Sequence, residues 1–598
     1  MDLTEELQRV LPLVPAEVLV TMKHMLPEEQ NALVRFWQKI LHDPELGQDQ
    51  TQRVRRLISA INRAEVPLTP GITSLGAELT LLTGQLPVFF ALTDPESNAN
   101  NPEVFNLRAL HSLLFKGDAE EALGWLDKVR EMGDNGSGLS VVAQNLLPRA
   151  ELMSQCLAYL AYSILGDEDE ATFASEEAGH LLAKNKYKDE DKYFWLWVFK
   201  ALSELDKQAW DNALQFSEDA YQIAQKLRLT THQGMALQLK GRALQGKQNH
   251  IPAYHAFLSA KKLLQETGSV FLVTLYSDLA ALERVVGRYG NARSYYQRTI
   301  VEAQGMGEKY APRFQLPGLK GLADLYLIQG SYQLALESYE RARRLAQDTR
   351  AHAVEAACLT AIGCIHTDQR NYTKARQSLV QSLTLREEYE LNKAYSLLEL
   401  GYVGLREDNV GLAETQLQLL RTQTQTPHLG TEIILFQAEV LTHQKLFDEA
   451  RSILERQLFL GLKEFDLRTR VPLALCRLAV KEAIEEDDNI YLEEAAERLE
   501  GIRSLATKPS FPSLQVLFLL LDAVWVFLDG KDRSESLDKI MKASKIAQKT
   551  RLLHITQRIE FYHRRFSRSR VRVNQQHLIE LLEDIQRNIL YLTRRILQ

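Results

Sequence analysis

Proline, glycine and cysteine are all scarce in this chain. It has 17 prolines and 30 glycines among 598 residues, below the average usage of about 5% and 7%. This scarcity excludes a collagen-like or linker-dominated chain, and it argues against an all-β protein, whose many turns depend on these two residues. Because 45% of the residues are apolar, the chain can fill a large core, which excludes a largely disordered protein.

The four cysteines are Cys156, Cys358, Cys364 and Cys476, and no two of them form a Cys-x-x-Cys pair. A large secreted protein held together by disulfides would need many more. We therefore expect four buried thiols in a reducing, cytoplasmic environment.

Long apolar runs and a surplus of positive charge are also lacking. The longest apolar run, 514–528, contains Asp522 and is shorter than the about 20 residues that cross a bilayer. The net charge is −7, so the chain has no overall basic field that would attract nucleic acid. The acidic residues that follow Met1 argue against a signal peptide. We expect a cytoplasmic protein that has no membrane partner.

An internal repeat fills the chain between residues 194 and 545. An alanine recurs in every second amphipathic segment, and a small residue stands twelve positions before it. This gap places the two small residues on facing helices of a hairpin, where small side chains let the helices pack closely. The recurring residues are Ala213, Ala253, Ala292, Ala335, Ala375, Ala413, Ala450 and Ala495, with Ser536 in the last copy. Their upstream partners are Ala201, Gly241, Ala280, Ala323, Gly363, Gly401, Ala438 and Ala483.

Large side chains stand three residues before and four residues after most of these alanines, as Tyr332 and Tyr339 do around Ala335. The arrangement resembles the tetratricopeptide repeat, a helix–turn–helix unit. The spacing of about 40 residues exceeds the roughly 34 of the standard repeat and is similar to that of kinesin light chains, LGN-type adaptors and the sensor region of MalT-like regulators. The resemblance implies an all-α fold, a right-handed α–α superhelix or tetratricopeptide-repeat solenoid.

On this pattern the chain divides into five parts. Residues 1–93 are expected to form a small helical module, either a cap or an adaptor for a second partner. The Asn- and Pro-containing segment 94–102 is expected to be a linker. The remaining parts are two divergent hairpins in 103–190, the repeat array in 191–548, and a basic connector with an amphipathic C-terminal helix in 549–598.

Two features of the C-terminal part, an arginine-rich segment and a final amphipathic helix, each have two possible interpretations. The arginine-rich segment Arg564–Arg572 is either a phosphate-contacting patch or a solvated connector. The final helix carries an apolar heptad seam, which predicts either a coiled coil between two copies or a helix that covers the last repeat. The seam residues are Leu578, Leu582, Ile585, Ile589, Leu592 and Ile596.

Motifs for catalysis, metal binding and cofactor binding are missing. Residues 241–248 have the spacing of a phosphate-binding loop, but Gln248 stands where a Ser or Thr would bind magnesium. No two histidines are three or four residues apart, so no helix presents a two-histidine metal face. The HExxH and GxSxG patterns are absent. We therefore expect a non-catalytic protein without a metal or a cofactor.

The resemblance implies a binding surface as well. In arrays of this family the first helices line a concave channel, which four positions of each repeat face. Here these include Gln238, Arg242, Gln245, Ser277, Arg284, Lys320, Asp324, Thr367, Tyr395, Tyr402 and Glu439. Such a mixture of polar and aromatic side chains suits an extended peptide or a helix. Asp324 stands where arrays that grip a chaperone's C-terminal carboxylate have Asn, which disfavours that ligand.

The sequence thus predicts a protein-interaction scaffold or adaptor that binds a peptide, a helix or a partner domain in the channel. The alternative is a regulatory sensor subunit, as in MalT-like proteins, whose array binds a small ligand or peptide and controls an effector. A homodimer is expected only through the C-terminal seam, and nucleic acid binding only through Arg564–Arg572.

Overall fold

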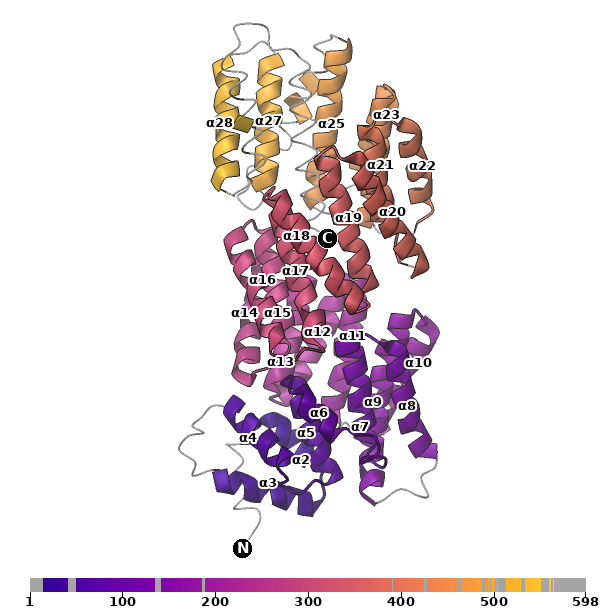
Figure 1. Cartoon of the computed structure of the whole chain (residues 1–598), viewed down its shortest axis with the longest axis vertical. Coiled ribbons are helices and arrows are strands. Elements are labelled where there is room, and N and C mark those ends of the chain that lie inside the picture. The colour runs from indigo at the N-terminus through magenta and orange to yellow at the C-terminus, as the bar shows by residue number, and fades with distance from the viewer. Residues whose placement is uncertain are drawn as a thin grey trace. The chain divides into compact units, whose positions relative to one another are not determined.

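All the regular structure of the described residues is helical. The computed structural model describes residues 14–40, 50–134, 141–184, 189–389, 391–423, 427–459, 465–486, 512–528 and 533–549, with single positions between 491 and 503 and between 556 and 563. Helices follow one another as antiparallel hairpins, and no strand occurs in these ranges (Figure 1). The predicted all-α repeat fold is confirmed.

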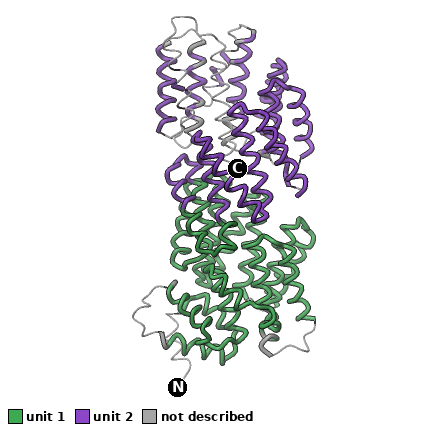
Figure 2. Tube along the Cα trace, in the orientation of Figure 1, with its two compact units in different colours: residues 1–282, 298–314 green, residues 283–297, 315–598 purple. Residues whose placement is uncertain are grey.

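Two compact units divide the chain (Figure 2). The first comprises residues 1–282 and 298–314, and the second comprises residues 283–297 and 315–598. Each is described by itself.

In the described part of residues 1–93, the first unit has five helices that do not follow the repeat. They are α2 (Ala16–Met22), α3 (Pro27–Ile40), α4 (Gln50–Asn62), α5 (Pro70–Leu82) and α6 (Leu86–Leu92), and together we call them the N-terminal module. Helix α5 is buried at eleven of its thirteen positions, so neighbours surround it almost completely. This segment therefore lies in the middle of a core and not on a surface.

Helical hairpins make up most of the remaining described residues of both units. The first members are α7 (Pro102–His111, continued by the π-turn η2, Ser112–Lys116), α9 (Val141–Leu165), α11 (Glu190–Asp206), α13 (Thr230–Gly246), α15 (Leu272–Val285), α17 (Ala311–Ile328), α19 (His352–Asp368), α21 (Ala394–Arg406), α23 (Pro427–His443), α25 (Phe465–Glu486) and α27 (Pro512–Leu528). The second members are α8 (Ala119–Asp134), α10 (Glu168–Lys184), α12 (Trp210–Lys226), α14 (His250–Thr267), α16 (Tyr289–Gln304), α18 (Tyr332–Asp348), α20 (Tyr372–Glu388), α22 (Val410–Arg421), α24 (Phe447–Phe459) and α28 (Arg533–Lys549).

The repeat alanines have one structural role. From Ala213 to Ala450 each is the fourth residue of its helix and has no exposed surface. Ser536 holds this place in α28, and Ala122 and Ala171 hold it in α8 and α10. The two upstream hairpins therefore follow the same rule as the array. Ala495 lies outside the described residues.

A left-handed residue closes the first helix of each hairpin from α7–α8 to α23–α24, five positions before the alanine. Gln208, Gln248, Gly330 and Arg370 all have φ between +59° and +71°, and the next amide bonds back to the helix, as from Asn249 to the Leu244 carbonyl at 2.9 Å. This is the Schellman arrangement, which satisfies carbonyls at a helix end. A common turn thus fixes these hairpins at the same register.

Gly166 allows this turn to be tested without a packing effect. Its φ is +78° and a Cβ built on it would meet nothing within 4 Å, so Gly166→Ala adds only backbone strain, about 1–2 kcal/mol for an L-residue in this region. We expect chemical denaturation to show a loss of this size in the free energy of unfolding. Gly124→Ala, an unhindered helical position, is the matched control and should stabilise by about 0.5–1 kcal/mol.

The segment expected to be a linker is held in place by hydrogen bonds. Asp94 accepts from the backbone amide of Ser97 at 3.0 Å, and the side-chain amide of Asn101 donates to the Pro70 carbonyl at 3.0 Å. Asn101 is buried. The segment therefore connects α6 to α7 along a fixed path.

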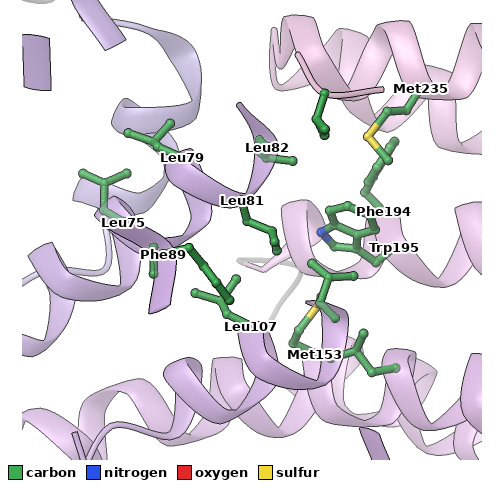
Figure 3. Close-up of a cluster of buried hydrophobic side chains, with 14 of the residues drawn as sticks. Leu75, Leu79, Leu81, Leu82, Phe89, Leu107, Met153, Phe194, Trp195 and Met235 are labelled. Carbon is green, nitrogen blue, oxygen red and sulfur yellow. The ribbon is translucent and has the colours of Figure 1, made fainter. Parts of the chain in front are cut away.

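The module and the hairpins that follow share one apolar core, which runs from Val14 to Tyr310. Leu81, Leu82 and Phe89 come from α5 and α6, and they face Met153, Trp195 and Met235 of α9, α11 and α13 (Figure 3). The first unit is thus built around the module.

Candidate interaction surface

Several residues expected to face the channel instead tie one repeat to the next. In the first unit the Gln238 side-chain amide donates to Thr274 Oγ1 at 3.0 Å and to Asp278 Oδ2 at 2.6 Å. Arg242 Nε lies 3.0 Å from Asp278 Oδ1, yet its side chain stays 41% exposed. Gln238 is buried, whereas Arg242, Gln245 and Ser277 keep part of their surface exposed.

In the second unit the corresponding network is closed to solvent. Arg284 Nη1 lies 3.2 Å from Asp324 Oδ2, and both side chains are buried. Lys320 lies 3.1 Å from the same carboxylate, and the Tyr339 hydroxyl also donates to it. Arg284 and Asp324 therefore serve the packing between repeats.

The remaining predicted residues of the second unit divide in the same way. Thr367 is buried and donates to the Gly363 carbonyl at 2.9 Å. Tyr402 packs on Phe436 with ring centroids 4.8 Å apart, and Glu439 pairs with Arg477 of the next first helix. Tyr395, Tyr402 and Glu439 remain partly exposed. They lie on α21 and α23 and form the candidate interaction surface of the second unit.

These pairs carry a signal that the sequence reasoning missed. Opposite charges stand about one repeat apart: Asp368 with Arg406 at 3.2 Å, and Glu439 with Arg477. Because first helices of adjacent repeats lie side by side, residues one period apart meet. Of these four residues only Glu439 was expected on the channel surface, and the resemblance that placed it there did not show that it pairs with Arg477.

A second group of charged residues joins the N-terminal module to the hairpins, and sequence reasoning did not find it. Its centre is Arg149 of α9, which is 3% exposed. The guanidinium lies 3.0 Å from Glu103, 3.3 Å from Asp189 and 2.5–2.8 Å from both oxygens of Asp191. Because three carboxylates surround the cation, burial does not prevent its ionisation, and the pKa of Arg149 is raised.

The N-terminal module meets this part of the hairpins through three polar contacts. We call the Arg149 group together with these three contacts the clasp. Glu78 of α5 lies 3.0 Å from Lys192 of α11. His24, between α2 and α3, has Nδ1 3.6 Å from Asp189. Glu17 of α2 accepts a hydrogen bond from the backbone amide of Thr231 at 3.4 Å. A carboxylate at the first turn of α13 suits the helix dipole there.

An aromatic group holds the other side of the module. His111 at the end of α7 lies among Phe89, Phe90 and Phe115, with ring centroids 4.9–5.5 Å apart, and Tyr310 lies 5.2 Å away. Burial lowers the pKa of His111 to about 3, so the ring is neutral and packs as an aromatic side chain. Residues 298–314 thereby belong to the first unit.

Acid should weaken the clasp. Burial and the Arg149 cation lower the pKa of His24 to about 4, against the opposing Asp189 and Asp191, with Lys192 also near. Burial lowers the pKa of His232 to about 4 beside Glu78, Lys192 and Asp191. Since both values lie below the unfolded value of about 6.5, the unfolded chain binds more protons, and stability present above pH about 6.5 is lost as the pH falls towards 4.

The measurement is the free energy of unfolding by urea between pH 7 and pH 4.5. We expect a decline in this window and a shallower slope in His232→Gln, with His255→Gln as the control at a histidine outside the clasp. An identical slope in all three proteins would contradict this assignment.

The clasp does not fit a metal centre. His24, Asp189 and Asp191 offer ligand atoms within 4.8 Å of one another. However, Arg149 already pairs with both aspartates, and a cation there would displace it. The geometry supports an ion-pair network.

The four cysteines are buried free thiols, as expected. Burial raises the pKa of Cys156 and of Cys476 to about 12. A thiol of this kind is rarely ionised at neutral pH and is a poor nucleophile. That the chain is not an enzyme stays a prediction.

The basic segment Arg564–Arg572 and the seam from Leu578 to Ile596 lie outside the described residues, so homodimerisation stays a prediction. Among the helices that are described, none has the length and apolarity that a bilayer crossing needs.

Comparison with known proteins agrees with the repeat. Residues 317–388 match the family model of the tetratricopeptide repeat. The Superkiller complex protein 3 of Mus musculus is 27% identical over 300 residues, which are 48% of this chain and 16% of that protein. The chain thus spans about a sixth of the length of this relative. The likeness to kinesin light chains, LGN-type adaptors and MalT-like regulators stays a prediction.

Solved structures with similar folds include the apo form of RapI, at a TM-score of 0.43 and 14% identity, covering 59% of this chain and 98% of that one. The apo form of the quorum sensor NprR from B. thuringiensis has a TM-score of 0.42 and 15% identity, covering 58% of this chain and 99% of that one. NprR in complex with its cognate peptide NprX has a TM-score of 0.40 and 15% identity, covering 60% and 99%.

Proposed function

We propose that this chain, which carries tetratricopeptide repeats, is a non-catalytic interaction scaffold that binds a peptide or helix on the inner face of its second unit. The observation that supports this is the candidate surface on α21 and α23, where Tyr395, Tyr402 and Glu439 are partly exposed. Tyrosine is enriched among the residues that dominate binding energies.

The pairing of neighbouring charges limits the class of ligand that this surface can bind. Asp368, Arg406, Glu439 and Arg477 compensate one another along successive first helices. A wall of this kind has little net charge to attract a strongly charged ligand, so the partner is expected to bind through apolar and aromatic contacts with a few hydrogen bonds. An amphipathic helix or a peptide with apolar anchors fits this chemistry.

Tyr402→Glu tests the surface. Peptides selected from a displayed random library on the immobilised full chain serve as the probe, and their affinities are measured by fluorescence anisotropy. We expect a loss of at least tenfold, because the substitution removes the ring that packs on Phe436 and adds a charge. Val380→Glu, at a side chain on α20 that is 51% exposed, is the matched control. Equal affinity of both variants would contradict the assignment.

A sensor subunit is the second candidate. The observation that favours it is the clasp, because ion pairs between the module and the hairpins add to their shared apolar core a polar contact that a ligand with a preference for an undocked state could replace.

A further inference from the structure

We propose that the N-terminal module is a ligand that the array binds in cis, and that it closes the inner face of α9, α11 and α13 against partner helices. This autoinhibitory contact rests on the proposed function, since it supposes that inner faces bind partners. It assigns the first unit a helix-binding groove whose occupant is α5 together with α2.

The register of the repeat shows which face is covered. Tyr395 stands eighteen residues before Ala413, and Trp195 and Met235 stand at the same place before Ala213 and Ala253. Tyr395 is partly exposed, whereas Trp195 and Met235 are 1% and 6% exposed. Leu81 and Leu82 of α5 lie in the same apolar core as both side chains (Figure 3).

The backbone contacts show that the module touches the first helices at their N-terminal ends. The amide of Val270, just before α15, donates to the Leu82 carbonyl at 2.9 Å. The amide of Thr231, in the first turn of α13, donates to Glu17. Amides at these places have no acceptor within their own helix, so an occupant of the groove supplies one.

The chemistry of the occupant defines the class of partner that can replace it. Helix α5 is largely apolar and Glu78 is its only charged residue, which pairs with Lys192. A competing ligand must therefore bring an apolar helix with a carboxylate placed to meet Lys192 or the first turn of α13.

Charge reversal on the module tests the proposal in the full chain. Glu78→Arg places a cation against Lys192 and leaves the groove itself unchanged. Glu96→Arg, at an exposed turn position in the segment that follows the module, is the matched control. The probe is a fluorescein-labelled peptide of residues 67–93, and hydrogen exchange of the α5 amides reports whether the module has left.

A disulfide provides the opposite variant. A Cβ built on Gly84 would lie 3.6 Å from the Cβ of Val270, within the about 3.5–4.5 Å that a disulfide requires. Gly84→Cys with Val270→Cys therefore ties the module to the array when oxidised. Added to Glu78→Arg, it should hold the module in place, and reduction should release it.

In Glu78→Arg we expect faster hydrogen exchange of the α5 amides and binding of the probe at least tenfold tighter than in the wild type or in Glu96→Arg. When the two cysteines are added to Glu78→Arg and oxidised, this binding should be lost. Faster α5 exchange without binding of the probe would contradict the proposal that the first unit has a helix-binding groove. Unchanged α5 exchange, or loss of helicity throughout the first unit, would show that the module is a permanent part of the fold. None of these outcomes depends on Tyr402, because the Tyr402→Glu experiment tests the surface of the second unit separately.

Discussion

Replacing Arg149 with alanine is expected to lower the free energy of unfolding of the first unit by about 3–5 kcal/mol, the loss usual when one partner of a buried ion network is removed. Glu103, Asp189 and Asp191 would lose their cation while remaining buried. The measurement is equilibrium urea denaturation followed by tryptophan fluorescence, because Trp195 lies in the adjacent core.

The control is Arg130→Ala. Arg130 pairs with Asp127, and the two side chains are 74% and 56% exposed. Exposed pairs contribute about 0–1 kcal/mol, so this variant should be nearly neutral. If the effect at Arg149 comes from unpaired carboxylates, adding Glu103→Gln and Asp191→Asn should recover part of the loss. Equal stability of Arg149→Ala and Arg130→Ala would contradict the clasp.

Enlarging a repeat glycine is expected to be the other large effect. A Cβ built on Gly241 would overlap the Phe257 ring of the same hairpin. Gly241→Leu must therefore separate α13 from α14, and overpacking of this kind costs about 1–3 kcal/mol or more. Thermal unfolding of the full chain by circular dichroism should show the first unit melting earlier.

Gly124→Leu is the matched variant, because a Cβ built there has no neighbour within 4 Å. A leucine on this exposed side of α8 should be neutral or slightly stabilising, since it replaces a glycine inside a helix. A similar loss in both variants would mean that helix crowding does not determine the repeat residues.

Periodicity made the fold predictable. Small residues at a fixed spacing report where helices cross, and each described alanine from Ala213 to Ala450 lies at such a crossing. One feature limited the prediction of the turns: five of them place a non-glycine residue, such as Gln248 or Asp408, at positive φ. Residue type alone does not reveal these turns, because the helix register around them imposes the conformation.

The candidate surface was harder to predict than the fold. Family geometry located Arg284 and Asp324 on the first helices, but only contacts between repeats show that they bury each other. The clasp left no periodic signal, because Glu78, Arg149 and Lys192 are far apart in sequence and meet only after the module docks. The sequence predicted a helical module in residues 1–93 but did not single out α5, because the apolar surface of that helix has no single stripe.

Hydrogen exchange at the Thr231 and Val270 amides tests the central claim, that the module occupies the inner face of the first hairpins. In the full chain at neutral pH, residue-resolved mass spectrometry should show both amides exchanging far below their intrinsic rates, since Glu17 and Leu82 accept from them. Ala353, an exposed residue of the first turn of α19, gives the reference for an uncovered helix start. Strong protection of Thr231 and Val270 relative to Ala353 is the result we predict. Exchange of all three amides at intrinsic rates would contradict the account.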